Sequence, residues 1–521
     1  MIVRNTILYK AILLVLTVAF LASVGMSQRY LNRQRDALGL TRVAPLENAP
    51  PVLAFTTVAL GGFRGLIANA LWIRANDLQE ADKYFEMVQL ADWITTLQPH
   101  FTTVWVHQAW NMAYNISIKF SDMNDRWLWV LRGIELLRDR GLRFNPKEPL
   151  IYRELAWFYQ HKLGQNLDDG HEFYKHVWAD EMQKVLGSGH PNFDELLTPP
   201  TSDVRDRVKT LREKYKLEPK FMKEVDETYG PLEWRLPETH AIYWGYVGLK
   251  ECPGARQEDL VQLRRNIFQS MQTAFHRGRM IFVTKGSFDF TYGPNIEIIP
   301  KVSKAYEEMI EQEPNVKENL QNGHKNFLKT AVYFLYTHNR LKSADEWFKY
   351  LQQLYPLALL TPEQLAIKQS NPEATFPPMS LDEYAVERVA EEVGDGGVDR
   401  TKAILEGYIH NALMSLAIGD DERAAGFERY AQLIWQNYMS RMSLPAAQKR
   451  VGLPPMADLR KEVRDQLLDR LDEENVEVAN QLRSALGLPA PSANASVIEG
   501  GAQPTEKPAT NQPPTQPGAK K

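Results

Sequence analysis

The stretch that decides the fold class is residues 327–356, which read FLKTAVYFLYTHNRLKSADEWFKYLQQLYP. Its apolar side chains recur at intervals of three and four residues, and this spacing places them on one face of an α-helix. The stretch LRRNIFQSMQTAF at 263–275 has the same period, and Gly and Pro fall between such stretches rather than inside them. From about residue 66 onward the sequence therefore predicts an all-α chain.

The helical stretches also repeat along the chain. Ala75 and Ala109 lie 34 residues apart, each in the middle of a helical stretch. The segment DKYFEMVQLADWITTLQP at 82–99 ends in a proline and is followed by TTVWVHQAWNMAY, in which the large Trp105 precedes the small Ala109. A period of this length is typical of stacked helical hairpins.

Three later units match the same pattern in part. The matching residues are Tyr152, Leu155, Ala156 and Tyr159 after Pro146, then Ala344, Phe348 and Pro356 within 325–356, then Tyr408, Ala412, Gly419, Ala424 and Ala431 within 405–436. About 13 residues are inserted around 120–143, Val332 occupies a position that favours a small residue, and the last unit lacks a closing proline. A further helix pair is predicted at 237–280.

These units resemble tetratricopeptide (TPR) repeats over roughly 66–187 and 325–436, with long insertions between them. The resemblance implies a TPR-like α-solenoid of helical hairpins, here behind an N-terminal transmembrane helix. In such repeats the small residues let the two helices of a hairpin approach closely, and the bulky residues fill the gap to the next hairpin. One unit cannot bury its own apolar face, so several must stack.

The sequence divides as follows: a signal anchor or transmembrane segment at 1–35, an apolar connecting helix at 36–65, TPR-like repeats at 66–187, a charged and proline-rich insertion at 188–236 with one or two short helices, helical repeats at 237–359 including the unit at 325–356, a second insertion at 360–400 around a helix near 381–393, a TPR-like unit at 401–456, a capping helix at 457–488 and a disordered tail at 489–521. The apolar stripe of the 457–488 helix favours a cap on the solenoid over a short coiled coil, which needs three or four sustained heptads. The tail has seven prolines and no aromatic residue, so it cannot bury a core.

The N-terminus contains AILLVLTVAFLASVGM at 11–26, a run of 16 residues without charge that residues 7–9 extend across Lys10. A membrane span needs about 20 apolar residues, with roughly 17 as the lower limit. The segment is therefore a short span or the core of a signal peptide. We expect an uncleaved signal anchor that crosses the membrane through residues 7–27. A cleaved signal peptide, which would make this a fully exported repeat protein, remains the alternative.

The orientation of this segment rests on two opposing observations. Arg4 and Lys10 precede the run while Arg29, Arg33 and Arg35 follow it, so the positive-inside count does not support a translocated body. A charged N-terminus before an apolar core is nevertheless the usual arrangement for export. We expect a single-pass protein of the cell inner membrane with its body in the periplasm.

Composition excludes several classes of site. There are 61 Lys and Arg against 65 Asp and Glu. The resulting net charge of -4 differs from the excess of basic residues that is typical of nucleic-acid-binding domains. The lone Cys252 excludes an intramolecular disulfide and a zinc site built on several thiolates. We therefore expect no nucleic-acid partner, and nothing in the sequence calls for a cofactor.

The nearest approach to a metal motif is HEFYKH, with His171, Glu172 and His176. Zinc-binding helices place two histidines four residues apart, whereas a separation of five turns the second imidazole about 140° away. A solvated helix face is the preferred interpretation, and an envelope metal-dependent hydrolase using these histidines and nearby acids is the alternative. The glycines of GGFRG (61–65) and GDGGVD (394–399) favour tight bends over phosphate or calcium loops. No catalytic or metal-binding residue is assigned, and an enzyme is not expected.

A partner-binding groove is the more plausible site. In TPR-like repeats the first helix of each hairpin lines the concave face, which here would carry His107, Trp110, Arg153, Trp157, Gln160 and His161. Arginine and aromatic residues dominate interface energies, and an extended peptide or a helix could dock against them. The competing interpretation is that Trp110 and Trp157 belong to the core between repeats. The sequence thus predicts a membrane-anchored TPR-like scaffold that binds other proteins, in a bacterial envelope assembly or biogenesis complex.

Overall fold

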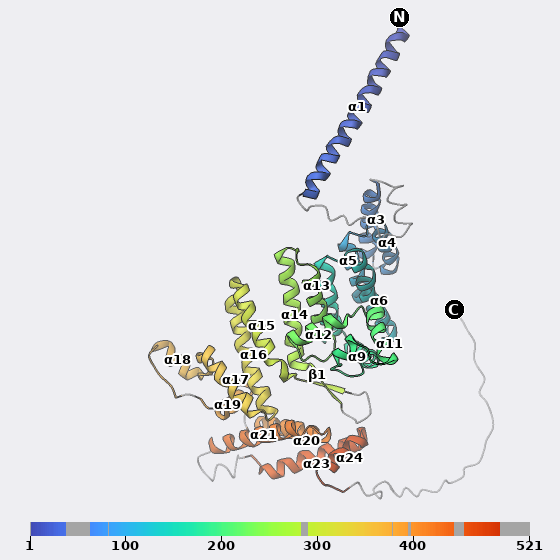
Figure 1. The fold of residues 1–521 in the computed structure, drawn as a ribbon. Helices are drawn as coiled ribbons and strands as arrows, with labels where there is room; N and C mark the ends of the chain where they lie inside the picture. Colours follow the sequence, from blue (N-terminus) through green and yellow to red (C-terminus); the bar gives the residue numbers. More distant parts are fainter. Residues whose placement is uncertain are drawn as a thin grey trace, which may run out of the picture. The chain divides into compact units, whose positions relative to one another are not determined.

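The computed structural model describes residues 2–37, 63–81, 83–282, 290–377, 379–393, 398–441 and 453–489. These residues are almost entirely helical, which confirms the predicted all-α class (Figure 1). The chain forms two compact units, Met1–Leu155 and Ala156–Lys521. Most of the predicted connecting helix at 36–65 and the predicted tail beyond Pro489 lie outside the described residues.

The described part of the first unit is helical. They are α1 (Ile2–Ala37), α3 (Phe63–Glu80), α4 (Tyr84–Leu97), α5 (Thr102–Trp110), α6 (Met123–Glu135), α7 (Leu142–Phe144) and most of α8 (Pro149–Trp157). Within α1, Ile12–Leu31 is long and apolar enough to cross a membrane, and none of it is buried. Length and composition of this kind also fit a signal sequence.

Small residues bring α3 and α4 together in this unit. Ala68 of α3 packs with Ala91 and Ile94 of α4, and Val104 of α5 completes this cluster. Trp105 is fully buried beside it, and its indole N–H donates a 2.9 Å hydrogen bond to the carbonyl oxygen of Pro99. Trp105 therefore fills space in the core, and its hydrogen bond also holds the turn that precedes α5.

Several helices of the chain end in a π-helical turn. Such turns occur at Asn111–Ile116 after α5, Leu136–Gly141 after α6, Phe158–Leu163 after α8 and Leu211–Tyr215 after α11. A π turn holds its hydrogen bonds between residues i and i+5, so it adds a residue to the turn and rotates every later side chain. Side chains after each π turn therefore point in a different direction from the one that an uninterrupted 3.6-residue period predicts.

The second unit contains the remaining elements. They are α9 (His171–Leu186), α10 (Phe193–Leu197), α11 (Ser202–Thr210), α12 (Pro219–Tyr229), α13 (Pro237–Glu251), α14 (Gln257–Arg277), β1 (Arg279–Phe282), β2 (Phe290–Gly293), α15 (Ile299–Gln312), α16 (Lys317–Thr337), α17 (Leu341–Leu354), α18 (Pro362–Ser370), α19 (Leu381–Val393), α20 (Val398–Ala417), α21 (Asp421–Arg441), α23 (Met456–Glu474) and α24 (Val476–Ala485). Three pairs of consecutive helices pack along their length, namely α13 with α14, α16 with α17, and α20 with α21 (Figure 1). Gly419 makes the turn between α20 and α21 with a φ of 77°, which a residue with a side chain rarely adopts.

The predicted insertion at 188–236 contains more helix than a loop with one or two short helices. It folds into α10, α11 and α12 because each has a local start signal. The side chains of Asn192 and Thr201 accept hydrogen bonds from the first backbone N–H groups of α10 and α11, and Pro219 is the first residue of α12. The helix predicted near 381–393 is present as α19.

Two local features differ from the predicted helices. Within 237–359 the chain forms an antiparallel pair of strands, β1 and β2, with Arg279 opposite Gly293 and Phe282 opposite Phe290. The helix predicted at 457–488 is two helices, because the side chain of Asn475 accepts a hydrogen bond from the N–H of Val478 and begins α24. The apolar stripe of α23 and α24 is buried and packs against α20 rather than pairing as a coiled coil.

Candidate functional site

Two of the three predicted groove residues of the first unit, Trp110 and Arg153, converge on a carboxylate. The indole N–H of Trp110 donates to Glu154 Oε2 at 2.8 Å, and the Arg153 guanidinium donates to Glu154 Oε1 at 2.6 Å. Glu154 is 6% exposed, and the Trp110 ring stacks on Tyr114 with centroids 4.3 Å apart. Trp110 and Arg153 are therefore brought together and held by Glu154, a residue that the sequence analysis did not single out.

His107 lies away from this carboxylate. Its Nε2 is 3.1 Å from Gln79 Oε1, and its ring packs edge-on against Trp72 at 5.1 Å. The side chain is half-buried, and this burial lowers the pKa of His107. The imidazole is consequently neutral at neutral pH and connects α5 to α3.

In the second unit, Trp157 and His161 form a stacked pair. Their rings lie 4.6 Å apart at 13°, and both side chains are half-buried. The indole nitrogen of Trp157 is buried without a hydrogen-bond partner. Burial is the main cause that lowers the pKa of His161, and the neighbouring Lys162 lowers it further. This pair is a half-buried aromatic surface, and the lowered pKa of His161 leaves its imidazole neutral at neutral pH.

Gln160 does not share a surface with that pair. It is 6% exposed, and its side-chain amide donates to Gln269 Oε1 of α14 at 2.9 Å. Gln160 lies in the π turn Phe158–Leu163, so its direction differs from the one that a continuous α-helix gives it. It is a core contact between helices.

The two histidines of HEFYKH lie on α9 and have separate surroundings. His171 Nδ1 is 3.0 Å from Lys175 Nζ, whereas the ring of His176 packs on Phe290 with centroids 4.4 Å apart. Lys175 is nearly buried, and its burial lowers its pKa to about 8. Among the described residues no group of three His, Cys, Asp or Glu side chains could hold a metal ion.

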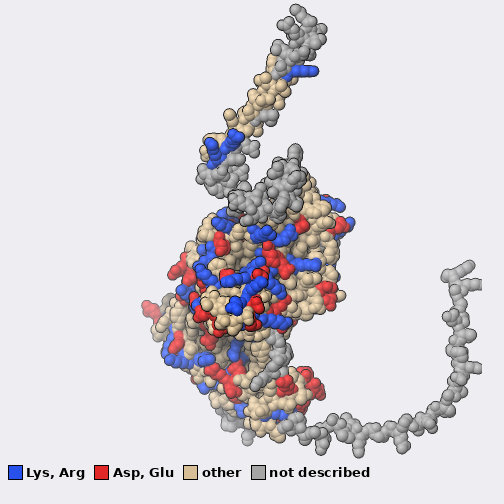
Figure 2. All heavy atoms as spheres, turned by 45° about the vertical axis from the view of Figure 1, so that its right-hand side comes forward, with Lys and Arg blue, Asp and Glu red and all other residues tan. Residues whose placement is uncertain are grey.

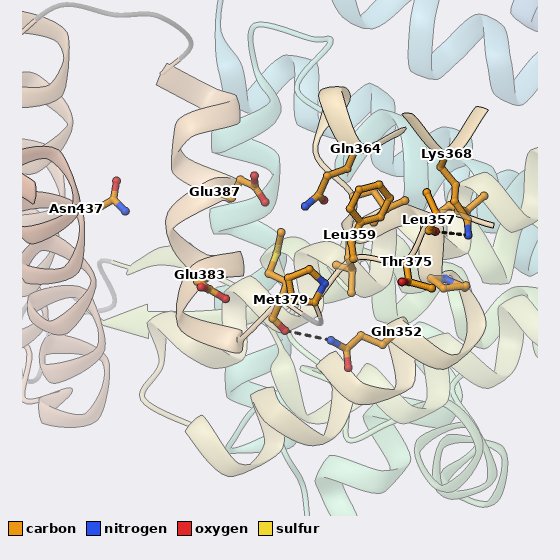
Figure 3. A pocket seen from close by; sticks show the side chains of 15 residues that line it. Gln352, Leu357, Leu359, Gln364, Lys368, Thr375, Met379, Glu383, Glu387 and Asn437 are labelled. Atoms are coloured by element: carbon orange, nitrogen blue, oxygen red, sulfur yellow. Dashed lines mark hydrogen bonds between the residues drawn. The ribbon is translucent and has the colours of Figure 1, made fainter. Parts of the chain in front are cut away.

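A described cavity lies elsewhere in the second unit, around the end of α17, α18 and α19 (Figure 3). Its volume is about 720 Å³. The lining residues are Gln352, Pro356, Leu357, Leu359, Leu360, Gln364, Lys368, Ala374, Thr375, Phe376, Pro377, Met379, Glu383, Glu387 and Asn437. We call this the α17–α19 cavity. A volume of this size accommodates a ligand or several side chains of a partner.

Many of the polar groups in this wall already bind the chain itself. The amide of Gln352 donates to the carbonyl oxygen of Met379 at 3.3 Å, and Lys368 Nζ donates to that of Ala374 at 2.7 Å (Figure 3). Gln364 completes a capping box with Thr361 at the start of α18. These groups hold the described residues 371–377 and 379 in place, and apolar side chains make up much of the remaining lining.

Two carboxylates and an exposed leucine also line the cavity. Leu357 is 55% exposed at the edge of the cavity. Glu383 and Glu387 stand on α19, one helical turn apart. Hydrogen bonds from Ser380 lower the pKa of Glu383, which keeps it ionised. The cavity therefore combines apolar contact with an acidic wall.

Little in the sequence indicates this cavity. Residues 360–400 combine prolines, a short helix and no strong motif, so their pattern predicts only an insertion. Pro356 and Pro362 each begin a new short helix after α17, so the chain leaves the path of α17 and lines the cavity before α19 begins. A pattern of prolines around an isolated helix is the one signal that could have indicated it.

Charge is distributed evenly over the part of the surface that can be followed. Acidic and basic side chains are interspersed among the described residues on the face drawn in Figure 2. The described middle of α1 carries no charged side chain, and basic residues stand near its ends. Neither a protein-family model nor a curated protein matches this sequence.

Proposed function

We propose that the chain is a membrane-anchored, TPR-like scaffold that binds other proteins, as part of a bacterial envelope assembly or biogenesis complex. The observation that carries the proposal is the burial of the repeat-like residues within consecutive helix pairs. Ala344 and Phe348 of α17 are 0% and 3% exposed, and Ala412 of α20 and Ala424 and Ala431 of α21 are at most 3% exposed. Small residues at helix contacts and bulky residues beside them are what a stacked hairpin array requires.

The earlier units support the same interpretation. Trp105 and Ala109 in α5 are fully buried, and Tyr152 and Leu155 in α8 are at most 4% exposed. These are the positions that match the repeat pattern, and a solenoid of such hairpins offers an extended surface to partners. The proposal assigns no catalytic residue, cofactor or metal.

The apolar helix α1 is the proposed anchor. The segment Ile12–Leu31 has the length of a membrane span and no acidic or basic residue except Arg29. We propose that it crosses the inner membrane once and that the body lies in the periplasm. Such an anchor confines the scaffold and its partner to the same surface.

The α17–α19 cavity is the proposed contact for a partner segment. Its apolar lining suits an aliphatic or aromatic anchor residue, and Glu383 and Glu387 suit a neighbouring lysine or arginine. Trp157 and His161 remain a second proposed contact because their stacked rings are half-exposed. Trp110 and Arg153 contribute through their shared carboxylate, Glu154, which holds them in one orientation.

Cross-linking in native membranes tests the proposal. We expect a tagged full-length chain, cross-linked before solubilisation and purified under denaturing conditions, to carry a reproducible set of envelope proteins. A matched strain in which Leu357 is replaced by Asp should lose part of that set at equal expression. Recovery of no specific protein from the wild-type chain would contradict the scaffold function.

A further inference from the structure

The exposed face of α3 changes character halfway along the helix. From its start to just past its middle, this face carries Leu66, 65% exposed, Ala70, and Ile73, 63% exposed. In its second half the same face carries Asp77 and Glu80. The exposed face is thus apolar near the N-terminus of α3 and acidic near its C-terminus.

Helix geometry explains why these residues share a face. Leu66, Ala70 and Ile73 are spaced at four and three residues, so they lie one above another on one side of α3. The opposite side carries the buried residues Ala68 and Ala75, which pack toward α4. The apolar residues of the exposed face therefore do not belong to the contact between α3 and α4.

An exposed tryptophan lies at the same end of the α3–α4 pair. The Gln98 side chain, just past the end of α4, lies beside Gly65 near the start of α3, so the two helices run antiparallel. Trp93, one turn before the end of α4, is 49% exposed. We call Leu66, Ile67, Ala70, Ile73 and Trp93 the α3–α4 apolar end; Ile67 is 38% exposed.

The order of the chain relates this surface to the anchor. Only residues 38–62 separate α1 from α3, and Pro51–Ile73 contains one charged residue, Arg64. A chain of that length reaches at most roughly 90 Å when fully extended. If α1 spans the membrane, the first part of α3 stays within that distance of the bilayer, and its apolar residues precede its acidic residues in the chain.

We propose that the α3–α4 apolar end docks on the bilayer surface into which α1 inserts. This inference rests on the proposed function through the anchoring by α1. Leucine and isoleucine side chains bury their area in the acyl boundary, and tryptophan prefers the headgroup level. Arg74 is exposed next to Ile73 and can bind a lipid phosphate, while Asp77 and Glu80 stay in water.

The division along one helix face favours the bilayer over a protein partner. A bilayer surface has an apolar layer, a polar layer and water in sequence, and the face of α3 has the same order from Leu66 to Glu80. A second copy of this chain or the segment 38–62 could also cover an apolar face. These occupants are distinguished by the experiment.

Fluorescence quenching in vesicles tests the docking. The full-length chain is reconstituted into vesicles of phosphatidylcholine and phosphatidylglycerol after labelling with an NBD probe at Ile73→Cys or, as the matched control one turn away, Asp77→Cys. Cys252 is buried, so the wild-type chain provides the labelling blank. We expect doxyl-labelled lipids to quench the probe at residue 73, and aqueous iodide to quench only the probe at residue 77.

Each other outcome contradicts the docking in a distinct way. Equal iodide quenching at both positions would show that the α3–α4 apolar end stays in water. Shielding of residue 73 from iodide without quenching by lipid would show that protein covers it. An alkaline wash of the same vesicles tests the anchor separately, because release of the chain contradicts anchoring by α1, whereas retention without lipid quenching contradicts only the docking.

Discussion

At the scale of single residues, Glu154 holds Trp110 and Arg153 in place, although the sequence pattern indicates only those two residues. Replacing Glu154 with Ala leaves the Trp110 indole N–H and the Arg153 guanidinium without their shared acceptor. Both donors are half-buried, so water can replace part of the lost bonding, and the cost falls below the roughly 1–3 kcal/mol of a fully buried donor. We expect the free energy of unfolding to fall by about 1 kcal/mol, measured by urea denaturation followed through tryptophan fluorescence.

Asp77→Ala is the matched control in the same unit, because Asp77 is an exposed carboxylate on α3. An exposed substitution of this kind should change stability by no more than about 0.5 kcal/mol. Equal effects of the two substitutions would mean that the bonds to Glu154 do not stabilise the unit.

A second residue-scale prediction concerns acid stability. His240 is fully buried, and its Nε2–H donates to the carbonyl oxygen of Trp234 at 2.9 Å. Burial lowers the pKa of His240 from 6.5 to about 4. Between these two pH values the histidine is protonated in the unfolded chain and neutral in the folded chain. The free energy of unfolding is therefore highest above pH 6.5 and falls by about 3 kcal/mol in total as the pH decreases to 4.

The test compares the slope of unfolding free energy against pH. We expect His240→Gln to lose less stability than the wild type between pH 7 and pH 5, although it is less stable at pH 7. His190→Gln, at an exposed position, should keep the wild-type slope. An unchanged slope in His240→Gln would contradict the assignment of a buried neutral histidine.

The sequence predicts which residue types lie on the candidate groove but not which partners hold them. Trp110, Arg153 and Trp157 follow from a helical period, but their partner Glu154 has no sequence signal that separates it from the many exposed acids. The prediction that Gln160 lies on the groove surface is wrong, because the π turn at Phe158–Leu163 rotates its side chain into contact with Gln269. A 3.6-residue period cannot anticipate a π turn, which depends on packing with other helices.

At the scale of elements, the close approach of α16 and α21 depends on one glycine. A Cβ atom at Gly426 of α21 would overlap the backbone oxygen of Thr337 at the end of α16. We expect Gly426→Ala to lower the free energy of unfolding by about 1–3 kcal/mol, because backbone atoms cannot yield as a flexible side chain does.

Gly407 of α20 provides the opposite control. It is an exposed helical glycine with no atom within 4 Å of a Cβ placed there. Gly407→Ala should raise the stability by about 0.5–1 kcal/mol, because alanine restricts the unfolded chain more than glycine does. A stabilising effect of both substitutions would show that α21 can move away from α16.

The elements themselves were mostly accessible to sequence reasoning. Strong three-and-four periodicity predicted helices at 263–275 and 327–356, and these are α14, α16 and α17. The strands β1 and β2 were not predicted, since four-residue strands give too short a signal between helices. The break at Asn475 was also missed, because one capping residue within a continuous apolar stripe does not alter the period.

At the scale of the whole molecule, the proposed anchor predicts how the chain fractionates. The full-length chain should remain in the membrane pellet after alkaline extraction, and a variant lacking residues 1–36 should be released. The mass of the mature chain separates an anchor from a cleaved signal peptide. A mature N-terminus at residue 1 or 2 agrees with the anchor, whereas a start after the apolar run of 11–26 would make this an exported protein.

Topology is a separate property of the same molecule. We expect protease added to cells with a permeabilised outer membrane to degrade the body of the chain, because the proposal places it in the periplasm. A cytoplasmic protein serves as the control for intact inner membranes. Full protection of the body under these conditions would reverse the proposed orientation.

The central claim is that this helical array holds partner proteins, and site-specific photo-cross-linking in native membranes tests it most directly. A photoreactive residue replaces Leu357 at the α17–α19 cavity or, as a control, Leu167, which is 74% exposed elsewhere in the same unit. We expect discrete cross-linked products of one or a few envelope proteins from position 357 and none of them from position 167. Identical products from both positions, or no product from position 357, would contradict it.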